Sequence, residues 1–138
     1  MNYKFIFKDK EYDLIEEKCE CFFNDEETPI NNIEVLNILD LLNKAENINF
    51  GLEYYAEPCE VCLHGKEQRK KVFPFLEYHF YIFTKDNNYI TSSISNDYEE
   101  NSYSGIYKKG KVDNSYIVSI MICENCGDYI IEIEQCNM

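Results

Sequence analysis

The chain has 138 residues, of which 45% are hydrophobic, and its formal net charge at pH 7 is -13. This length suits one domain and allows a hydrophobic core, so we expect a single globular domain over residues 1–138. A strongly acidic protein is repelled by phosphate backbones, which disfavours a nucleic-acid partner.

The sequence lacks the long apolar segments that direct proteins to or across membranes. The longest apolar stretch, Ile117–Cys123, is far shorter than the roughly 20 residues of a membrane-spanning helix. The N-terminal stretch MNYKFIFKDKEY lacks the apolar region of a signal peptide. We therefore expect a cytoplasmic protein without a membrane partner.

The first predicted element is a β-hairpin near the N-terminus. Tyr3, Phe5 and Phe7 are spaced to share one strand face, Tyr12 and Leu14 share a face again, and Asp9-Lys10 can form the turn between them. The segment that follows, CECFFNDEET, has no clean period, and we expect it to be a connection.

One amphipathic helix is predicted over about residues 29–45. Its start would be Thr28 followed by Pro29, or alternatively Asn31 with Glu34 as a capping box. The apolar residues that recur at helical spacing are Ile30, Ile33, Leu36, Ile38, Leu41, Leu42 and Ala45. This stripe needs a sheet to cover.

Several strands are predicted after the helix. Residues 48–56 alternate in polarity like a strand with one buried face, and residues 75–95 read as two strands joined at Asp86-Asn87-Asn88, where asparagine tolerates left-handed backbone. A short strand is expected near 105–108, and two more at 116–122 and 129–134. The predicted fold class is α+β, a mostly antiparallel sheet with one helix packed on it.

Two of the predicted turns carry paired cysteines. Seven cysteines in a chain without an export signal argue against a disulfide scaffold, since the number is odd. Cysteines spaced i and i+3 in a tight turn direct both sulfurs to one point, and a following glycine, here Gly65 or Gly127, eases the turn. Four thiolates suit tetrahedral Zn²⁺. The predicted ligands of one structural zinc ion are Cys59, Cys62, Cys123 and Cys126.

These two turns resemble the knuckles of a zinc ribbon, in which two β-hairpins clamp one zinc ion. Cys123–Gly127 matches that pattern closely, whereas the first turn places Leu63 and His64 ahead of Gly65. The gap between the turns exceeds the usual spacing of about 15 to 20 residues, and an inserted hairpin around Asn87 would explain it. More loosely, the chain resembles an uncharacterised family of small bacterial proteins of unknown function with paired CxxC motifs, which implies no activity.

Other interpretations of the cysteine pairs remain open. A rubredoxin-like iron site uses similar turns, and the pairs could also be unrelated hairpin turns with buried cysteines. A closed four-thiolate site leaves no open position for water, so we do not expect hydrolysis. Both pairs lie between strands and not at a helix start, so we do not expect a thioredoxin-like disulfide reductase.

The remaining candidate residues have weaker patterns. His64 could replace one cysteine, and His79 fits a strand side chain better than a catalytic base. Cys19, Cys21 and Cys136 lack this spacing, although in an extended segment Cys19 and Cys21 would project to one face and could form a second thiol site.

A basic run of four residues follows the first cysteine pair. It could bind nucleic-acid phosphate, or it could offset the charge of about -2 that four thiolates leave around Zn²⁺. The acidity of the chain favours the second interpretation. The run consists of Lys66, Arg69, Lys70 and Lys71.

The sequence thus predicts a non-catalytic zinc-binding structural or interaction protein whose partner is another protein. A nucleic-acid-associated zinc ribbon is the alternative, and a thiol redox protein comes third.

Overall fold

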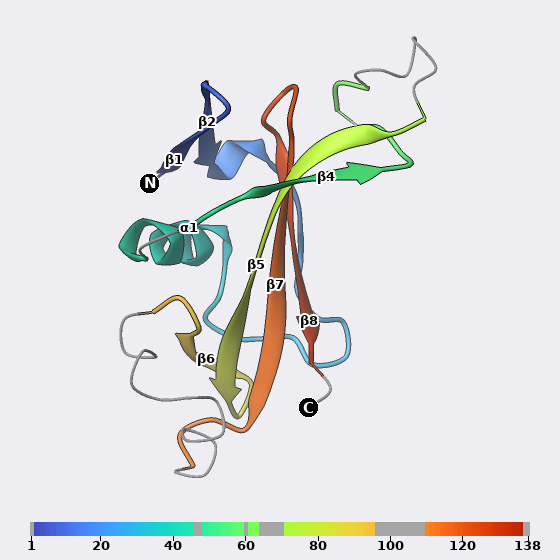
Figure 1. The fold of residues 1–138 in the computed structure, drawn as a ribbon. Coiled ribbons are helices and arrows are strands. Elements are labelled where there is room, and N and C mark those ends of the chain that lie inside the picture. The colour runs from blue at the N-terminus through green and yellow to red at the C-terminus, as the bar shows by residue number, and fades with distance from the viewer. Residues whose placement is uncertain (1, 46–47, 60, 64–70, 96–109, 137–138) are drawn as a thin grey trace.

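The computed structural model describes residues 2–45, 48–59, 61–63, 71–95 and 110–136. In these ranges the chain forms a two-stranded sheet, a six-stranded sheet and one α-helix, α1 (Val35–Lys44) (Figure 1). The strands are β1 (Asn2–Phe7), β2 (Lys10–Ile15), β3 (Cys19–Phe23), β4 (Gly51–Tyr55), β5 (Phe73–Lys85), β6 (Asn88–Ser92), β7 (Asn114–Cys123) and β8 (Tyr129–Gln135), and a 3-10 turn (Glu16–Lys18) links β2 to β3.

The small sheet is the predicted N-terminal hairpin. β1 and β2 pair antiparallel, with Phe5 opposite Tyr12. The turn residues are Lys8 and Asp9, one position earlier than expected, and both have positive φ angles of 47° and 65°. Two consecutive left-handed residues match the twist of a two-residue hairpin. Phe5 stacks on Phe50 with ring centroids 4.5 Å apart, which joins the hairpin to the main core.

The large sheet has the strand order β3-β8-β7-β5-β4, and β6 also pairs with β5. β5 has 13 residues and is long enough to pair with β4 near its start, with β6 near its end and with β7 along its other side. All pairs are antiparallel except β3 with β8. The mostly antiparallel sheet is confirmed. The prediction of a connection over CECFFNDEET is wrong for Cys19–Phe23, which form β3, and holds for residues 24–28.

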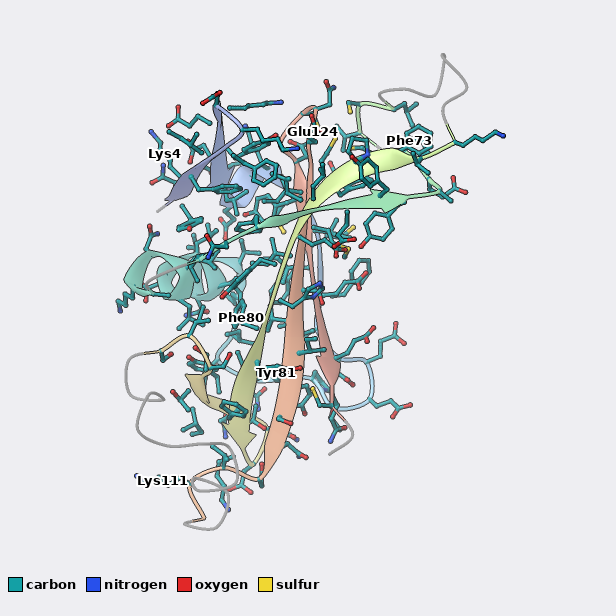
Figure 2. All side chains as sticks on the ribbon, in the orientation of Figure 1. Lys4, Phe73, Phe80, Tyr81, Lys111 and Glu124 are labelled. Carbon is teal, nitrogen blue, oxygen red and sulfur yellow. The ribbon has the colours of Figure 1, made fainter. Side chains whose placement is uncertain are left out.

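One face of the large sheet carries the hydrophobic core. Figure 1 shows α1 and the β1–β2 hairpin on the same side of the long strands β5, β7 and β8. The strand side chains that point there alternate along the sequence, as a half-buried sheet requires. Figure 2 shows side chains, with Phe80 labelled, in the space between α1 and β5. They include the fully buried Leu76, Ile82, Tyr116, Val118, Ile120, Ile122, Ile131 and Ile133, and α1 adds Ile38, Leu39 and Leu42.

The helix begins at Val35, six residues later than predicted. Ile30 instead exchanges backbone hydrogen bonds with the Asn24 side chain, at 2.9 Å and 3.0 Å. Asn31 pairs with the β5–β6 turn through a 2.7 Å bond from its N–H to the Asn87 carbonyl. Ile30 and Ile33 are buried although they lie in a non-helical segment before α1, so their spacing matched the helical period by chance. Glu34 is the N-cap, and its N–H donates to Asn37 Oδ1 at 2.7 Å.

The other predicted strands have mixed outcomes. The β5–β6 hairpin is confirmed, with Asp86 and Asn87 at positive φ angles of 53° and 65°. Residues 48–56 contain β4, but its buried face is incomplete, since Tyr54 is 60% exposed. The strand expected at 105–108 lies outside the described residues. None of the helices in the described part of the chain has the length and apolar character of a membrane span.

The Asn24 contacts generate a stability prediction. In Asn24→Ala, the N–H and carbonyl of Ile30 lose their partners in a partly buried loop, so the free energy of unfolding should fall by about 1–3 kcal/mol. Urea denaturation followed by circular dichroism measures this. Glu27→Ala alters an exposed side chain of the same loop and should change stability by less than about 0.5 kcal/mol. Equal effects of the two variants would contradict the role given to Asn24.

Candidate metal centre

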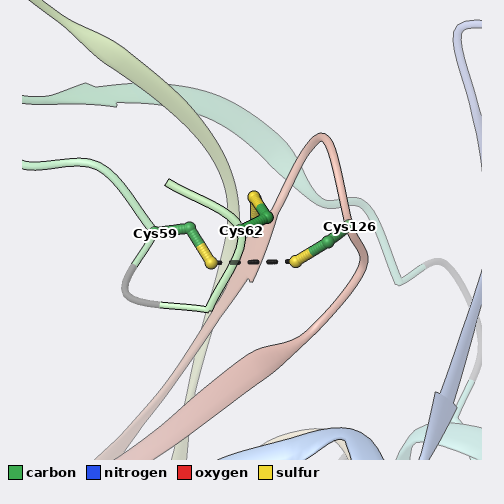
Figure 3. Close-up of side chains that lie close together, drawn as sticks. Cys59, Cys62 and Cys126 are labelled. Carbon is green, nitrogen blue, oxygen red and sulfur yellow. Dashed lines mark hydrogen bonds between the residues drawn. The ribbon is translucent and has the colours of Figure 1, made fainter. Parts of the chain in front are cut away.

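The two cysteine pairs lie next to each other at one end of the large sheet. Cys59 and Cys62 belong to the connection between β4 and β5. Cys123 is the last residue of β7, and Cys126 lies in the turn between β7 and β8. β5 pairs with β7 in a register that puts Phe75 opposite Cys123. This pairing brings the two turns together, and Figure 3 shows Cys59 and Cys126 facing each other across the gap between them.

Four sulfur atoms converge at this point. Cys59 Sγ lies 3.7 Å from Cys126 Sγ, and Cys62 Sγ lies 3.7 Å from Cys123 Sγ. All four lie within 4.8 Å of one another, Cys123 being buried and the others half-buried. Among the described residues, no other group of three or more potential ligands is this compact. The cluster therefore has the donors and the spacing to hold a metal ion.

The two turns share one backbone hydrogen bond and one left-handed residue at equivalent positions. The N–H of Leu63 donates to the Cys59 carbonyl at 2.9 Å, and the N–H of Gly127 donates to the Cys123 carbonyl at 3.0 Å. Both donors have positive φ, 51° for Leu63 and 82° for Gly127. The left-handed residue thus directly follows the second cysteine in each turn. The predicted glycine of the first turn, Gly65, lies outside the described residues, and Leu63 holds the equivalent position.

Burial and backbone hydrogen bonds act in opposite directions on the thiols of the second turn. Burial raises the pKa of Cys123 to about 11, although the N–H groups of Cys126 and Asn125 partly lower it. Burial also raises the pKa of Cys126, against the lowering effect of the Asp128 N–H. These N–H groups point at the sulfurs and would stabilise thiolates once a cation offsets the burial.

The N-terminal hairpin braces the second turn. Lys10 Nζ donates to the carbonyls of Glu124 and Asn125 at 2.6 Å and 2.9 Å, and the Tyr12 hydroxyl donates to the Glu124 carbonyl at 3.0 Å. Asn125 Nδ2 lies 3.5 Å from Cys62 Sγ and so connects the two turns. Sequence reasoning missed these residues. No local signal relates Lys10 to a turn more than a hundred positions away, and Asn125 is marked only by its place inside the CxxC motif.

The basic run after the first turn is not placed by the structure. His64, Lys66, Arg69 and Lys70 lie outside the described residues, and Lys71 is exposed. The interpretation of this run as an offset for thiolate charge stays a prediction. Lys10 is a cation that the structure does place beside the cluster.

The other cysteines do not join the cluster. A register shift between Cys19 and Cys21 interrupts the pairing of β3 with β8. Cys19 therefore packs against the core, while Cys21 lines a groove on the opposite face of the sheet. The expectation that both project to one face is wrong because of this irregularity. Cys136 follows β8, and its N–H donates to the Ser115 carbonyl at 2.9 Å.

His79 lies on the outer face of the sheet in a short polar row. Its Nδ1 is 2.8 Å from Ser119 Oγ, and its Nε2 is 3.3 Å from Glu77 Oε2. The row has the residue types of a hydrolase triad. However, Ser119 pairs with β5 on one side and β8 on the other, so neighbouring backbone N–H groups are engaged in the sheet and do not form an oxyanion hole. The row carries no argument for catalysis.

The left-handed residue that follows the second cysteine of each turn predicts different effects of two substitutions. Gly127→Ala should lower the free energy of unfolding by about 1 kcal/mol or more, because alanine disfavours positive φ. The cost would come from the backbone, since the new Cβ would meet only Lys18 Nζ, at 3.8 Å. Leu63→Gly removes a strained, 44% exposed leucine and should leave stability unchanged or raise it by up to about 1 kcal/mol. Denaturation midpoints measure both, and similar losses in the two variants would contradict this account.

Comparisons with known proteins identify a family but no activity. A family model described as "Protein of unknown function (DUF3785)" matches residues 3–138. Searches of the curated proteins and of the solved structures give no match. Since the family model covers nearly the whole chain, the protein belongs to the DUF3785 family.

Proposed function

We propose that Cys59, Cys62, Cys123 and Cys126 bind one structural Zn²⁺, and that the chain is a non-catalytic, zinc-ribbon-like protein that acts by binding another protein. The ion would join the connection after β4 to the turn after β7, so its role is to hold two hairpins of one sheet together.

The spacing of the sulfur atoms carries this proposal. Four Zn–S bonds of about 2.3 Å in a tetrahedron place neighbouring sulfurs about 3.8 Å apart. The separations across the two turns are both 3.7 Å, and the longest separation in the cluster is no more than 4.8 Å. The longest sulfur–sulfur separations would need to shorten only slightly for the four sulfurs to form a tetrahedral ligand set.

The chemistry of the donors favours zinc with a structural role. Four thiolates are the common ligand set of closed zinc sites, and such a site has no open position where water could be activated. Iron in a rubredoxin-like site would use the same ligands, and metal analysis distinguishes the two. A four-thiolate zinc centre carries a charge of about -2. The ammonium group of Lys10, which contacts two carbonyl groups of the turn after β7, would partly offset this charge.

Surface features support a protein partner over a nucleic acid. The net charge of -13 would repel phosphate. Three of the exposed apolar side chains, Phe23 at 51%, Val61 at 46% and Tyr55 at 38%, line one groove on the surface. Apolar side chains gathered on a surface often mark protein interaction sites.

Metal content tests the proposed site directly. Protein purified under reducing conditions should contain about one zinc ion per chain, and serine at any one of the four ligand positions should lower this sharply. Cys19→Ser, Cys21→Ser and Cys136→Ser are matched controls and should retain the ion. Co²⁺ replacing zinc should show the strong visible absorption of a tetrahedral thiolate complex. Full zinc content in Cys59→Ser or Cys123→Ser would contradict the proposal.

The Lys10 contacts predict a tuning effect on metal affinity. Lys10→Met keeps much of the side-chain length but removes two charge-assisted hydrogen bonds and a cation beside an anionic centre. Apparent zinc affinity, measured by competition with a chromophoric chelator, should fall by about tenfold. Lys4→Met removes an exposed charge from the neighbouring strand and should have little effect. Equal affinities for Lys10→Met and the unaltered protein would show that Lys10 does not stabilise the site.

A further inference from the structure

We propose that a groove on the outer face of the large sheet binds an extended peptide segment of a partner protein, with apolar side chains flanked by lysine or arginine. This inference rests on the proposed function, because the metal-binding connection after β4 forms one wall of the groove. The groove indicates the chemistry of the partner, whereas the metal site alone gives no information about a partner.

The groove lies on the face of the sheet opposite α1. Its volume is about 380 Å³, within the usual range of ligand sites, roughly 300–1,000 Å³. One wall comes from the connection after β4 and the other from β3, while β5, β7 and β8 form the floor. The apolar residues that define it are Phe23, Pro58, Val61, Phe75, Met121 and Ile130.

The groove walls are rich in aromatic and aliphatic groups that solvent can reach. Phe23 is 51% exposed, Val61 46% and Tyr55 38%. Tyr55 is held in place by an edge-on contact with Phe75, at 5.4 Å between ring centroids, and by its hydroxyl, 3.8 Å from Met121 Sδ. Because these contacts hold the Tyr55 side chain in place, the wall is already formed before an apolar side chain binds. Less conformational entropy is then lost on binding.

Carboxylates surround the apolar groove and select the sign of the occupant's charge. Glu20, Glu57, Asp128 and Glu132 line it, and none of the described lining residues is basic. Past Phe23 and Glu132 the surface continues into a second hollow of about 570 Å³, lined also by Asp25, Glu26, Glu27 and Glu134. This charge distribution repels nucleic acids and complements lysine and arginine.

The arrangement of the two hollows indicates an extended occupant. They share Phe23 and Glu132, so an apolar seat lies directly beside an acidic one. A peptide in extended conformation can place an apolar side chain in the first and a basic side chain in the second. A compact small molecule would use only one of them.

The metal would control one wall of this groove. Cys59 is both a proposed zinc ligand and a lining residue, and Pro58 and Val61 are its near neighbours in the chain. Release of the ion would free this connection and remove the wall. Peptide binding should therefore depend on zinc, although no peptide atom would contact the metal.

Selection from a random library of peptides about twelve residues long tests this inference on the zinc-loaded full chain. Enriched peptides should combine leucine or aromatic residues with nearby lysine or arginine. Their affinity should fall at least tenfold in Glu132→Lys and in Val61→Asp, neither of which alters a proposed ligand. Glu11→Lys makes the same charge change on the exposed side of β2 and should bind like the unaltered chain. Zinc content and circular dichroism establish that each variant is folded.

The inference is overturned if no peptide is enriched, if enriched peptides are acidic, or if the groove variants bind them unchanged. The metal centre and the groove can fail separately. Full zinc content with no peptide binding contradicts the groove alone. A chain that contains no zinc but binds basic-apolar peptides in a Val61- and Glu132-dependent way contradicts the proposed metal centre and the zinc dependence of the wall, while it supports the groove as the peptide site.

Discussion

The antiparallel pairing of β5 with β7 determines where the candidate metal centre and the proposed peptide groove lie. The register runs from Phe75 opposite Cys123 to Thr84 opposite Asn114. At one end it brings together two cysteine turns whose facing residues are 61 and 67 positions apart in sequence. It also gives the sheet two different faces. One packs against α1 and the N-terminal hairpin, and the other carries the apolar groove with its acidic border.

A metal ion at the sulfur cluster would act as a local cross-link in a fold that has its own core. Structural zinc sites contribute roughly 10–16 kcal/mol of apparent binding energy, comparable with the roughly 5–15 kcal/mol net stability of a whole domain. The core cluster draws on α1, β2, β5, β7 and β8 and contains none of the four cysteines. We infer that such an ion would order the end of the sheet, while burial of apolar side chains stabilises the remainder. Lys10 and Tyr12 connect these two regions.

Sequence patterns predicted the features that depend on local periodicity and spacing. The N-terminal hairpin, the β5–β6 hairpin and the strands on either side of Cys123-Cys126 follow from alternating apolar residues and turn-forming residues. The CxxC spacing pointed to the four cysteines that the fold brings together. The rest depended on contacts between distant segments. β3 is defined by parallel pairing with β8, the late start of α1 by the Asn24 and Asn87 contacts, and the Lys10 brace by the packing of two sheets.

X-ray absorption at the zinc edge of the purified, reduced protein tests the central claim most directly, because it reports the number, type and distance of the ligands. The account predicts one zinc ion per chain with four sulfur neighbours at about 2.3 Å and no nitrogen or oxygen ligand. A first shell that contains nitrogen or oxygen would contradict the four-cysteine site. The four-cysteine site would also be contradicted if the reduced protein failed to take up one zinc ion per chain when zinc is supplied.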